Sequence, residues 1–331
     1  MLFVPILLLI VGFVALIKGG DWFVDGATGI ARRFHLPEIL IGATVVSIGT
    51  TLPEVMVSAG AALQGSGSIA YGNAIGSIIC NTALIAAITI AIKPGPASGK
   101  TLLFPAGFFF GSMALYAVGS YVLGSFPRWM GIVLLAIFVA YMTATVLRMK
   151  KTNEIPALAE GEEIVVESEE AGTKDSLLKD IILLVLGAAA IAVGADLLVD
   201  NAIVIAETCG MSEKVIGLTI VALGTSLPEL VTAITSLVKG HGSLSLGNIV
   251  GANLFNLILV SGAAITINPF ALPISGTVAG INSSLIIDLP VAIGVMLILT
   301  VPTIFKNKLA RWQGISLLAI YTAFLVLQFV I

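Results

Sequence analysis

Long apolar runs alternate with short polar segments along the whole chain. About 20 consecutive apolar residues are enough for a helix to cross the hydrocarbon core of a bilayer. Ten such runs lie at roughly 2–20, 37–63, 69–92, 102–122, 128–147, 178–206, 212–238, 243–265, 279–304 and 310–330. This pattern predicts an all-α polytopic membrane protein with ten transmembrane helices.

One polar pattern occurs twice within these runs. The stretch Gly42–Asn81 returns as Gly217–Asn256, offset by 175 residues and without a gap. The first five helices therefore match the second five. Because five is odd, the second copy must enter the bilayer from the opposite side, as in the inverted repeats of secondary transporters. We expect two five-helix repeats, at residues 1–147 and 178–331, joined by a linker at 148–177.

Both copies carry a proline inside an apolar run, in Gly49–Glu54 and in Gly224–Glu229. A proline inside a helix removes one backbone hydrogen bond and clashes with the carbonyl four residues back. Freed carbonyls at membrane depth are tolerated where they line a polar cavity. We therefore expect helices 2 and 7 to be broken at these positions, with carbonyl oxygens available to a cation.

Composition and charge agree with a membrane protein and add an orientation. The chain of 331 residues is 58% hydrophobic and 11% charged. Thirteen of its 16 Lys and Arg residues fall in alternate loops, and such loops are usually cytoplasmic. This predicts a multi-pass protein of the plasma membrane with both termini extracellular and the linker 148–177 cytoplasmic. The linker is strongly acidic and is interpreted as solvated; a calcium-sensing patch is the alternative, although no EF-hand spacing supports it.

The polar side chains of the repeat carry the candidate chemistry. Glu54 and Glu229 lie inside apolar runs, where ionisable groups are costly and usually functional. Each shares a helical face with hydroxyl groups three and four residues earlier. The following helices add amide stripes at a spacing of four. The set is Thr50, Thr51 and Glu54, with Thr225, Ser226 and Glu229, and Asn73, Ser77 and Asn81, with Asn248, Ala252 and Asn256.

Pairing the two halves about a pseudo-two-fold axis would bring both glutamates to the bilayer midplane. The resulting site contains only oxygen ligands, which suit hard cations such as Na⁺, Ca²⁺ or Mn²⁺ rather than zinc or copper. Two other classes remain open. An intramembrane hydrolase could use the two carboxylates as acid and base, and a passive channel could be lined by acidic rings. A hydrolase has no need of matched ligand stripes in both halves, and no motif indicates an enzyme, a cofactor, a nucleic acid or a protein partner.

The motifs GTTLPE and GNAIGSIICN in the first half, and GTSLPE and GNIVGANLFN in the second, resemble the cation/calcium exchanger superfamily. The similarity is greatest to its archaeal and bacterial sodium/calcium exchangers. The resemblance implies antiport of about three Na⁺ for one Ca²⁺ by alternating access, with a sliding pair of helices beside a cluster of four ion sites. A Ca²⁺/H⁺ antiporter is the alternative.

The resemblance also implies roles for single residues. Glu54 and Glu229 would be shared by the Ca²⁺ and Na⁺ sites, with Asn81 as a central ligand. Further oxygens would come from Thr50, Thr51, Thr225, Ser226 and Ser77 and from the carbonyls of Ser47 and Ala222. Two positions differ from the archaeal pattern: Asn256 replaces an aspartate and Ala252 replaces a serine. The amide of Asn256 still offers an oxygen, and its neutrality favours a potassium-independent exchanger.

Overall fold

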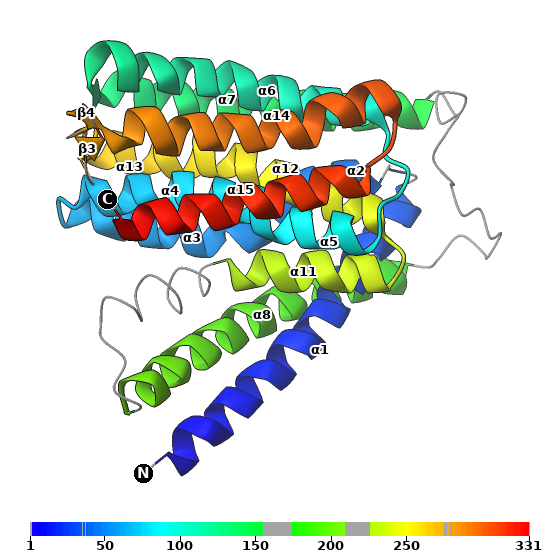
Figure 1. The fold of residues 1–331 in the computed structure, drawn as a ribbon. Helices are drawn as coiled ribbons and strands as arrows, with labels where there is room; N and C mark the ends of the chain where they lie inside the picture. The colour runs from blue at the N-terminus through cyan, green and yellow to red at the C-terminus, as the bar shows by residue number, and fades with distance from the viewer. Residues whose placement is uncertain are drawn as a thin grey trace. The chain divides into compact units, whose positions relative to one another are not determined.

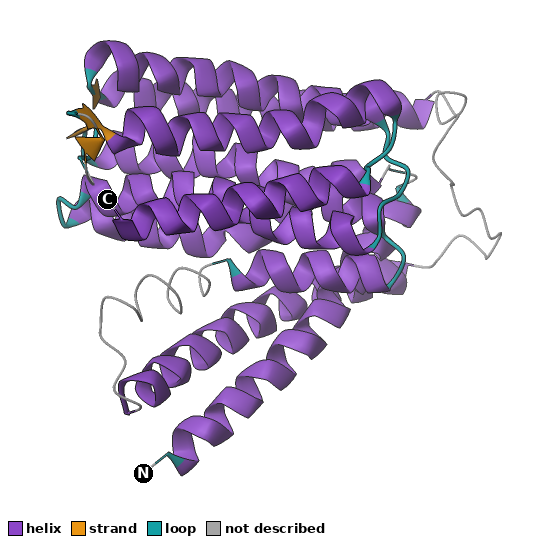
Figure 2. Ribbon diagram, in the orientation of Figure 1, coloured by secondary structure: helices purple, strands orange, loops and turns teal. Residues whose placement is uncertain are grey.

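The computed structural model describes residues 2–34, 36, 38–154, 174–208, 226–274, 277–278 and 280–330. Helices dominate this part of the chain, and its few strands are each two residues long (Figure 2). Eight of the described helical segments are long and apolar enough to cross a membrane. They coincide with eight of the ten predicted runs, which confirms a helical, multi-pass membrane protein.

The other two predicted runs are not among these eight segments. The seventh run, 212–238, falls partly outside the described residues, and its described part is helix α11 (Leu227–Val238). The tenth run, 310–330, is helix α15 (Arg311–Val330). The count of ten transmembrane helices therefore stays a prediction.

The described helices belong to two compact units, one of Met1–Leu36 with Val165–His241 and one of Pro37–Ile164 with Gly242–Ile331. Each unit combines chain from both halves of the sequence. The predicted division into 1–147, 148–177 and 178–331 follows the sequence, whereas the two compact units are defined by contacts in space. It stays a prediction.

The first unit contains α1 (Phe3–Arg33), α8 (Lys174–Thr208) and α11. Helices α1 and α8 lie side by side along much of their length (Figure 1). Glycines allow this close approach: a Cβ added to Gly19 would lie 2.8 Å from the amide nitrogen of Ile191, and one on Gly194 would lie 2.9 Å from the carbonyl oxygen of Gly12. Small residues at such contacts let membrane helices pack backbone to backbone.

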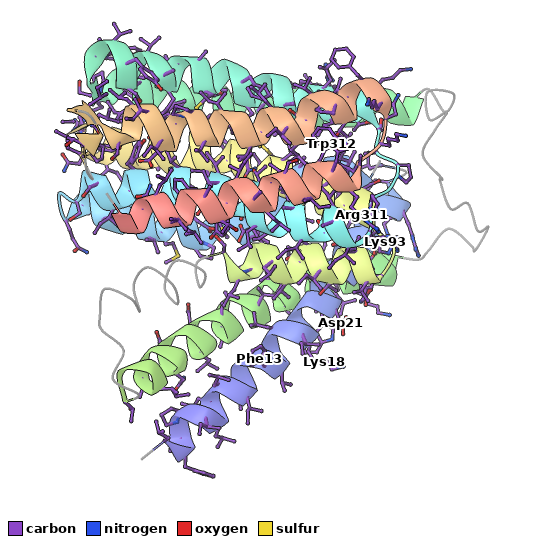
Figure 3. The ribbon with its side chains drawn as sticks, viewed as in Figure 1. Phe13, Lys18, Asp21, Lys93, Arg311 and Trp312 are labelled. Atoms are coloured by element: carbon purple, nitrogen blue, oxygen red, sulfur yellow. The ribbon has the colours of Figure 1, made fainter. Side chains whose placement is uncertain are left out.

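Ion pairs fasten the three helices of the first unit at one end. Lys239, which follows α11, lies 2.8 Å from a carboxylate oxygen of Asp25 and 3.4 Å from one of Asp21, both on α1. Arg33 lies 3.8 Å from Asp180 of α8. Helix α1 itself continues to Arg33, past both aspartates, whereas the first predicted apolar run ends at residue 20. Asp21 and Lys18 are labelled on this helix in Figure 3.

The second unit holds the remaining described elements. In chain order they are α2 (Glu38–Ile41), η1 (Gly42–Val46), α3 (Ser47–Leu63), α4 (Gly67–Cys80), η2 (Asn81–Ala86), α5 (Ala87–Ile92), α6 (Gly99–Ala117), η3 (Val118–Leu123), β1 (Ser125–Phe126), α7 (Arg128–Glu154), α12 (Gly242–Phe255), η6 (Asn256–Val260), α13 (Ser261–Ile267), β2 (Phe270–Ala271), β3 (Thr277–Val278), β4 (Ile281–Asn282), η7 (Ser284–Asp288), α14 (Leu289–Lys306) and α15. The η elements are π-helical turns that interrupt or extend the α-helices.

Short strands and single contacts join the helix ends of this unit. Strand β1 pairs antiparallel with β2, and β3 pairs with β4 across a turn in which Gly280 has a φ of 81°. At the opposite ends of the helices, Arg311 at the start of α15 donates to the carbonyl of Ile92 at 3.4 Å. Figure 3 labels this arginine beside Lys93. The predicted ninth run begins at 279, whereas the helix itself starts only after the β3–β4 hairpin.

Two further expectations concern the linker and the broken helix. Helix α7 runs to Glu154 and α8 begins at Lys174, so helix extends into both ends of segment 148–177; residues 155–173 lie outside the described residues. The break predicted at Gly49–Glu54 is not confirmed, because Ser47–Leu63 is one α-helix with Pro53 inside. The irregular turn is η1, directly before it. Membrane helices tolerate such prolines when neighbouring groups satisfy the freed backbone.

Candidate functional site

Helix α12 packs tightly against η1 and the start of α3. Glycines make this possible: a Cβ on Gly42 would lie 2.5 Å from the carbonyl oxygen of Leu244 and 2.8 Å from the amide nitrogen of Asn248. A Cβ on Gly251 would collide with the hydroxyl of Ser47 and would lie 2.6 Å from the Cα of Ala43. The glycines of the two motifs thus bring polar groups from both halves of the sequence into contact inside one unit.

Hydroxyl groups of α3 meet the amide of Asn248 at this contact. The Ser47 hydroxyl lies 3.0 Å from the Asn248 carbonyl oxygen and 2.7 Å from the carbonyl oxygen of Gly42. The Thr50 hydroxyl lies 3.3 Å from Oδ1 of Asn248. All three side chains are buried. Asn248 was noted in the sequence as part of an amide stripe but not as a ligand, and its spacing of eight from Asn256 is the signal that could have included it.

Glu54 lies inside α3 and is fully buried, with an exposed fraction of 0%. Its backbone carbonyl accepts a hydrogen bond from Nδ2 of Asn73 at 3.1 Å, and the same amide nitrogen lies 2.8 Å from the hydroxyl of Ser58. Asn73 therefore ties α4 to α3 at the level of the glutamate. A buried carboxylate at membrane depth needs compensation by charge or by hydrogen bonds.

The two candidate asparagine ligands occupy equivalent positions in the two repeats. Asn81 is the first residue of the π-helical turn η2, and Asn256 is the first residue of η6. Both side chains are fully buried. Within the described part of the chain, neither amide oxygen nor amide nitrogen of these two residues has a hydrogen-bond partner. Leaving a buried polar group unsatisfied costs about 1–3 kcal/mol, and π-helical turns are frequent at functional sites.

The hydroxyl of Thr51 is also buried and has no hydrogen-bond partner among the described residues. By contrast, serine hydroxyls bind the first backbone carbonyl of two of the π-helical turns. Ser47 reaches the carbonyl of Gly42, at the start of η1, and Ser261 reaches the carbonyl of Asn256, at the start of η6, at 3.1 Å. Each serine stands five residues after the carbonyl that it binds. One backbone carbonyl in each of these two turns therefore has a side-chain donor, while the Asn81 and Asn256 side chains have no partner among the described residues.

A second amide, Asn253, joins α12 to η2. Its Nδ2 donates to the hydroxyl of Thr82 at 2.7 Å and lies 3.2 Å from the sulfur of Met296. The Thr82 hydroxyl in turn lies 2.8 Å from the carbonyl of Ile78. The sequence pattern did not single out this pair, because neither residue has a polar counterpart at the offset of 175.

The matching glutamate of the second half lies in the first unit. Helix α11 begins at Leu227 after Ser226, and Pro228 and Glu229 occupy its first turn. Glu229 is fully buried and Ser226 is 3% exposed. A carboxylate in the first turn of a helix is stabilised by the exposed backbone N–H groups and the helix dipole. Thr225 and Ala222 lie outside the described residues.

Two further positions from the sequence analysis, Ser77 and Ala252, lie in the second unit. Ser77 on α4 is 4% exposed, and Ala252 on α12 is fully buried. Among the described residues, no three His, Cys, Asp or Glu side chains gather as a metal cluster. The second unit contains one of the two candidate carboxylates, Glu54, and buried hydroxyl, amide and carbonyl oxygens. Such oxygens are ligands for hard cations.

Comparison with known proteins decides the family. The profile of the family described as sodium/calcium exchanger protein matches residues 4–147 and 179–330. The chain belongs to this sodium/calcium exchanger family. Membership confirms the predicted relation to the cation/calcium exchanger superfamily. It also confirms that the chain is an antiporter of ions rather than an enzyme.

Relatives and solved structures match over nearly the whole exchanger. Sodium/calcium exchanger MaX1 of Methanosarcina acetivorans is 32% identical over 358 residues, covering 100% of both chains. The uncharacterized membrane protein MJ0091 of Methanocaldococcus jannaschii is 32% identical over 325 residues, covering 94% of both chains. The structure of the sodium-calcium exchanger NCX_Mj soaked with 2.5 mM Na⁺ and 10 mM Sr²⁺ matches with a TM-score of 0.77 at 31% identity, covering 98% of both chains.

Proposed function

We propose that this exchanger moves Ca²⁺ across the membrane against Na⁺ by alternating access, with about three Na⁺ for one Ca²⁺. One observation carries the proposal. Each half of the sequence supplies a buried glutamate and an asparagine that heads a π-helical turn, at the same offset of 175 residues. A transporter built from inverted repeats places its ion site between such matched elements.

In this proposal Glu54 and Glu229 bind the same Ca²⁺ ion. Two carboxylates neutralise one divalent cation, and Ca²⁺ takes six to eight oxygen ligands. The unpartnered amides of Asn81 and Asn256 and the hydroxyl of Thr51 would supply further oxygens. The Na⁺ ions would use the same glutamates, with oxygens of Thr50, Ser77, Thr225 and Ser226 and the carbonyls of Ser47 and Ala222. Competition for shared carboxylates couples the two fluxes.

The neutral Asn256 supports independence from potassium. A carboxylate at this position would add a third negative charge and a hard ligand for another monovalent ion. The amide instead offers one oxygen without charge. We therefore propose exchange driven by Na⁺ alone, with K⁺ and H⁺ as ions that do not contribute.

The proposal includes an orientation in the plasma membrane. Thirteen of the 16 basic residues lie on one predicted side, which supports extracellular termini and a cytoplasmic segment 148–177. The two halves would then be five-helix repeats of inverted topology, whose ten helices include α11 with the residues before it and α15.

A vesicle assay with crossed gradients tests this function. Purified protein is reconstituted, the vesicles are loaded with Na⁺, K⁺ or acid, and radioactive Ca²⁺ uptake is followed after dilution into buffer without that ion. We expect uptake only from Na⁺-loaded vesicles, unchanged by K⁺. Uptake driven by a pH gradient without sodium would instead identify a Ca²⁺/H⁺ antiporter, and flux without any counter-ion would identify a channel.

Variants make the assay specific to the site. Glu54→Gln and Glu229→Gln should each abolish Na⁺-driven uptake, because each removes one of the two charges that hold Ca²⁺. Asp200→Asn, which makes the same chemical change at an exposed carboxylate of α8, is the matched control and should transport normally. Wild-type uptake by either glutamine variant would contradict the proposed function.

A further inference from the structure

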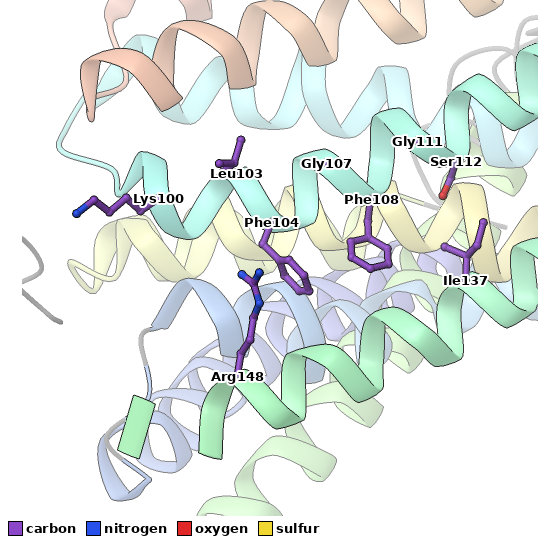
Figure 4. A pocket seen from close by; sticks show the side chains of 9 residues that line it. All are labelled: Lys100, Leu103, Phe104, Gly107, Phe108, Gly111, Ser112, Ile137 and Arg148. Carbon is purple, nitrogen blue, oxygen red and sulfur yellow. The ribbon is translucent and has the colours of Figure 1, made fainter. Parts of the chain in front are cut away.

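A separate groove lies between α6 and α7, within the second unit. Its volume is about 560 Å³, within the range of sites that hold small ligands. Figure 4 shows that α6 provides one wall and that Ile137 and Arg148 of α7 provide the other. None of the lining residues belongs to the proposed ion site; they are Lys100, Leu103, Phe104, Gly107, Phe108, Gly111, Ser112, Ile137 and Arg148.

The spacing along α6 explains the shape of this groove. The lining residues recur every three or four positions, which places them on one face of the helix. Gly107 and Gly111 stand one turn apart on this face, and a Cβ added to either would meet no atom within 4 Å. The two glycines therefore leave open space beside the helix. The aromatic rings of Phe104 and Phe108, 5.0 Å apart and edge to face, flank that space.

The groove has a charged end and an apolar end. Lys100 and Arg148 lie at one end, and Ile137 and Ser112 lie at the other (Figure 4). The Arg148 guanidinium carbon lies 3.7 Å from the centroid of the Phe104 ring. Stacking on an aromatic ring holds the plane of a guanidinium in place. No acidic residue is among the nine that line the groove.

We propose that this groove binds one anionic phospholipid, with its phosphate at Lys100 and Arg148 and an acyl chain along Gly107 and Gly111. Basic pockets between transmembrane helices on the cytoplasmic side are suited to anionic headgroups, and this end is the one predicted to be cytoplasmic. From Lys100 to Gly111 the helix rises about 17 Å at about 1.5 Å per residue. One leaflet contributes about 15 Å of hydrocarbon, so the groove has the length of one acyl chain.

A second copy of the chain fits the groove less well. Two glycines spaced by four can form a close contact between membrane helices. However, a two-fold axis along the membrane normal would place the same surface of both copies together. The Lys100 and Arg148 side chains of both copies would then meet at one depth, where like charges repel. An anionic headgroup neutralises these cations instead.

Native mass spectrometry of the full-length protein tests the proposal. The purified protein is titrated with phosphatidylglycerol and, separately, with phosphatidylcholine carrying identical acyl chains. One variant, Lys100→Gln with Arg148→Gln, removes the charges. Another, Gly107→Leu with Gly111→Leu, fills the groove. The matched controls are Lys93→Gln, a cation that directly follows α5 and lies outside the groove, and Gly294→Leu, whose Cβ position on α14 is equally open.

We expect the wild type to retain one phosphatidylglycerol in preference to phosphatidylcholine. Each basic side chain near the membrane surface contributes a factor of about five in affinity, so the charge variant should bind phosphatidylglycerol about thirty-fold more weakly. The filled variant should lose both lipids, and the two controls should bind as the wild type does. If the double charge variant lowers the melting temperature, Lys100→Gln alone carries the headgroup test.

Three results would overturn the proposal. One is equal wild-type affinity for the two lipids. Another is unchanged lipid retention when the groove is filled. The third is a lipid-free dimer that Gly107→Leu with Gly111→Leu dissociates, because this would identify a second copy as the occupant.

Discussion

The hydroxyl of Ser47 lies 3.0 Å from the backbone carbonyl oxygen of Asn248, a residue 201 positions later in the chain. This contact joins the first residue of α3 to the middle of α12. It depends on the close approach that Gly42 and Gly251 allow. The proposed ligands of the first half are therefore positioned by helices of the second half within the same compact unit.

This packing predicts a strong effect at Gly251. In Gly251→Ala the new methyl group would meet the Ser47 hydroxyl and lie 2.6 Å from the backbone of Ala43. Overpacking of this kind costs about 1–3 kcal/mol, so the free energy of unfolding should fall by that amount in a reversible detergent unfolding experiment. The control is Gly60→Ala on α3, where a Cβ meets nothing within 4 Å. It should be neutral or stabilising by up to about 1 kcal/mol. Equal destabilisation by both variants would contradict the packing.

Asn253 and Thr82 should be energetically coupled. Their hydrogen bond of 2.7 Å is buried, and a net contribution of about 0.5–1.5 kcal/mol is typical of such a bond. A double-mutant cycle of Asn253→Ala and Thr82→Val, read out as the free energy of unfolding, should give a coupling energy in this range. A coupling energy indistinguishable from zero would show that the bond does not hold α12 against η2.

Asn256→Asp should strengthen Ca²⁺ binding. If Asn256 is a ligand, the substitution replaces a neutral oxygen by a carboxylate and adds a third negative charge to the site. We expect an affinity increase of about tenfold or more, measured by Ca²⁺ titration calorimetry, with slower Na⁺-driven release. Asn256→Ala should weaken binding. The matched test in the first repeat is Asn81→Asp, which should act in the same direction. Unchanged affinity in all three variants would exclude the two asparagines as ligands.

The ion pair between Lys239 and Asp25 should contribute little to stability. Its N–O distance is short at 2.8 Å, but the two side chains are 25% and 54% exposed. Water and salt screen such pairs, which are typically worth less than about 1 kcal/mol. Asp25→Asn should therefore lower the free energy of unfolding by less than this, and the difference should shrink at high salt. A loss of several kcal/mol would mean that the pair acts in an environment with far less water.

Much of the architecture follows from hydropathy alone. The apolar runs predicted eight of the described helices. The cost of an ionisable group in hydrocarbon singled out Glu54 and Glu229, and both side chains are buried in the structure. The π-helical turns at Asn81 and Asn256 were not predictable, because a single turn with i→i+5 hydrogen bonds shifts the spacing of apolar positions by only one residue. The contact between Ser47 and Asn248 was also hidden, since it depends on which helices pack together.

The region around Pro53 shows another limit of the sequence. Proline removes one hydrogen bond and was expected to break the helix, yet α3 continues through it. The irregular geometry falls instead at η1, where the hydroxyl of Ser47 satisfies the carbonyl of Gly42. Local propensity located the irregular region to within about two turns. The tertiary hydrogen bond that the same hydroxyl makes to the backbone carbonyl of Asn248 could not be read from the local sequence.

The central claim is that Glu54 and Glu229 bind one Ca²⁺ ion together. The most direct measurement is an anomalous difference map from crystals of this protein soaked with Sr²⁺, an electron-rich substitute for Ca²⁺. If both glutamates hold the ion, one strong peak should lie at coordination distance, about 2.3–2.6 Å, from oxygens of both carboxylates. A map whose peak contacts only one of the two glutamates, or neither, would contradict it.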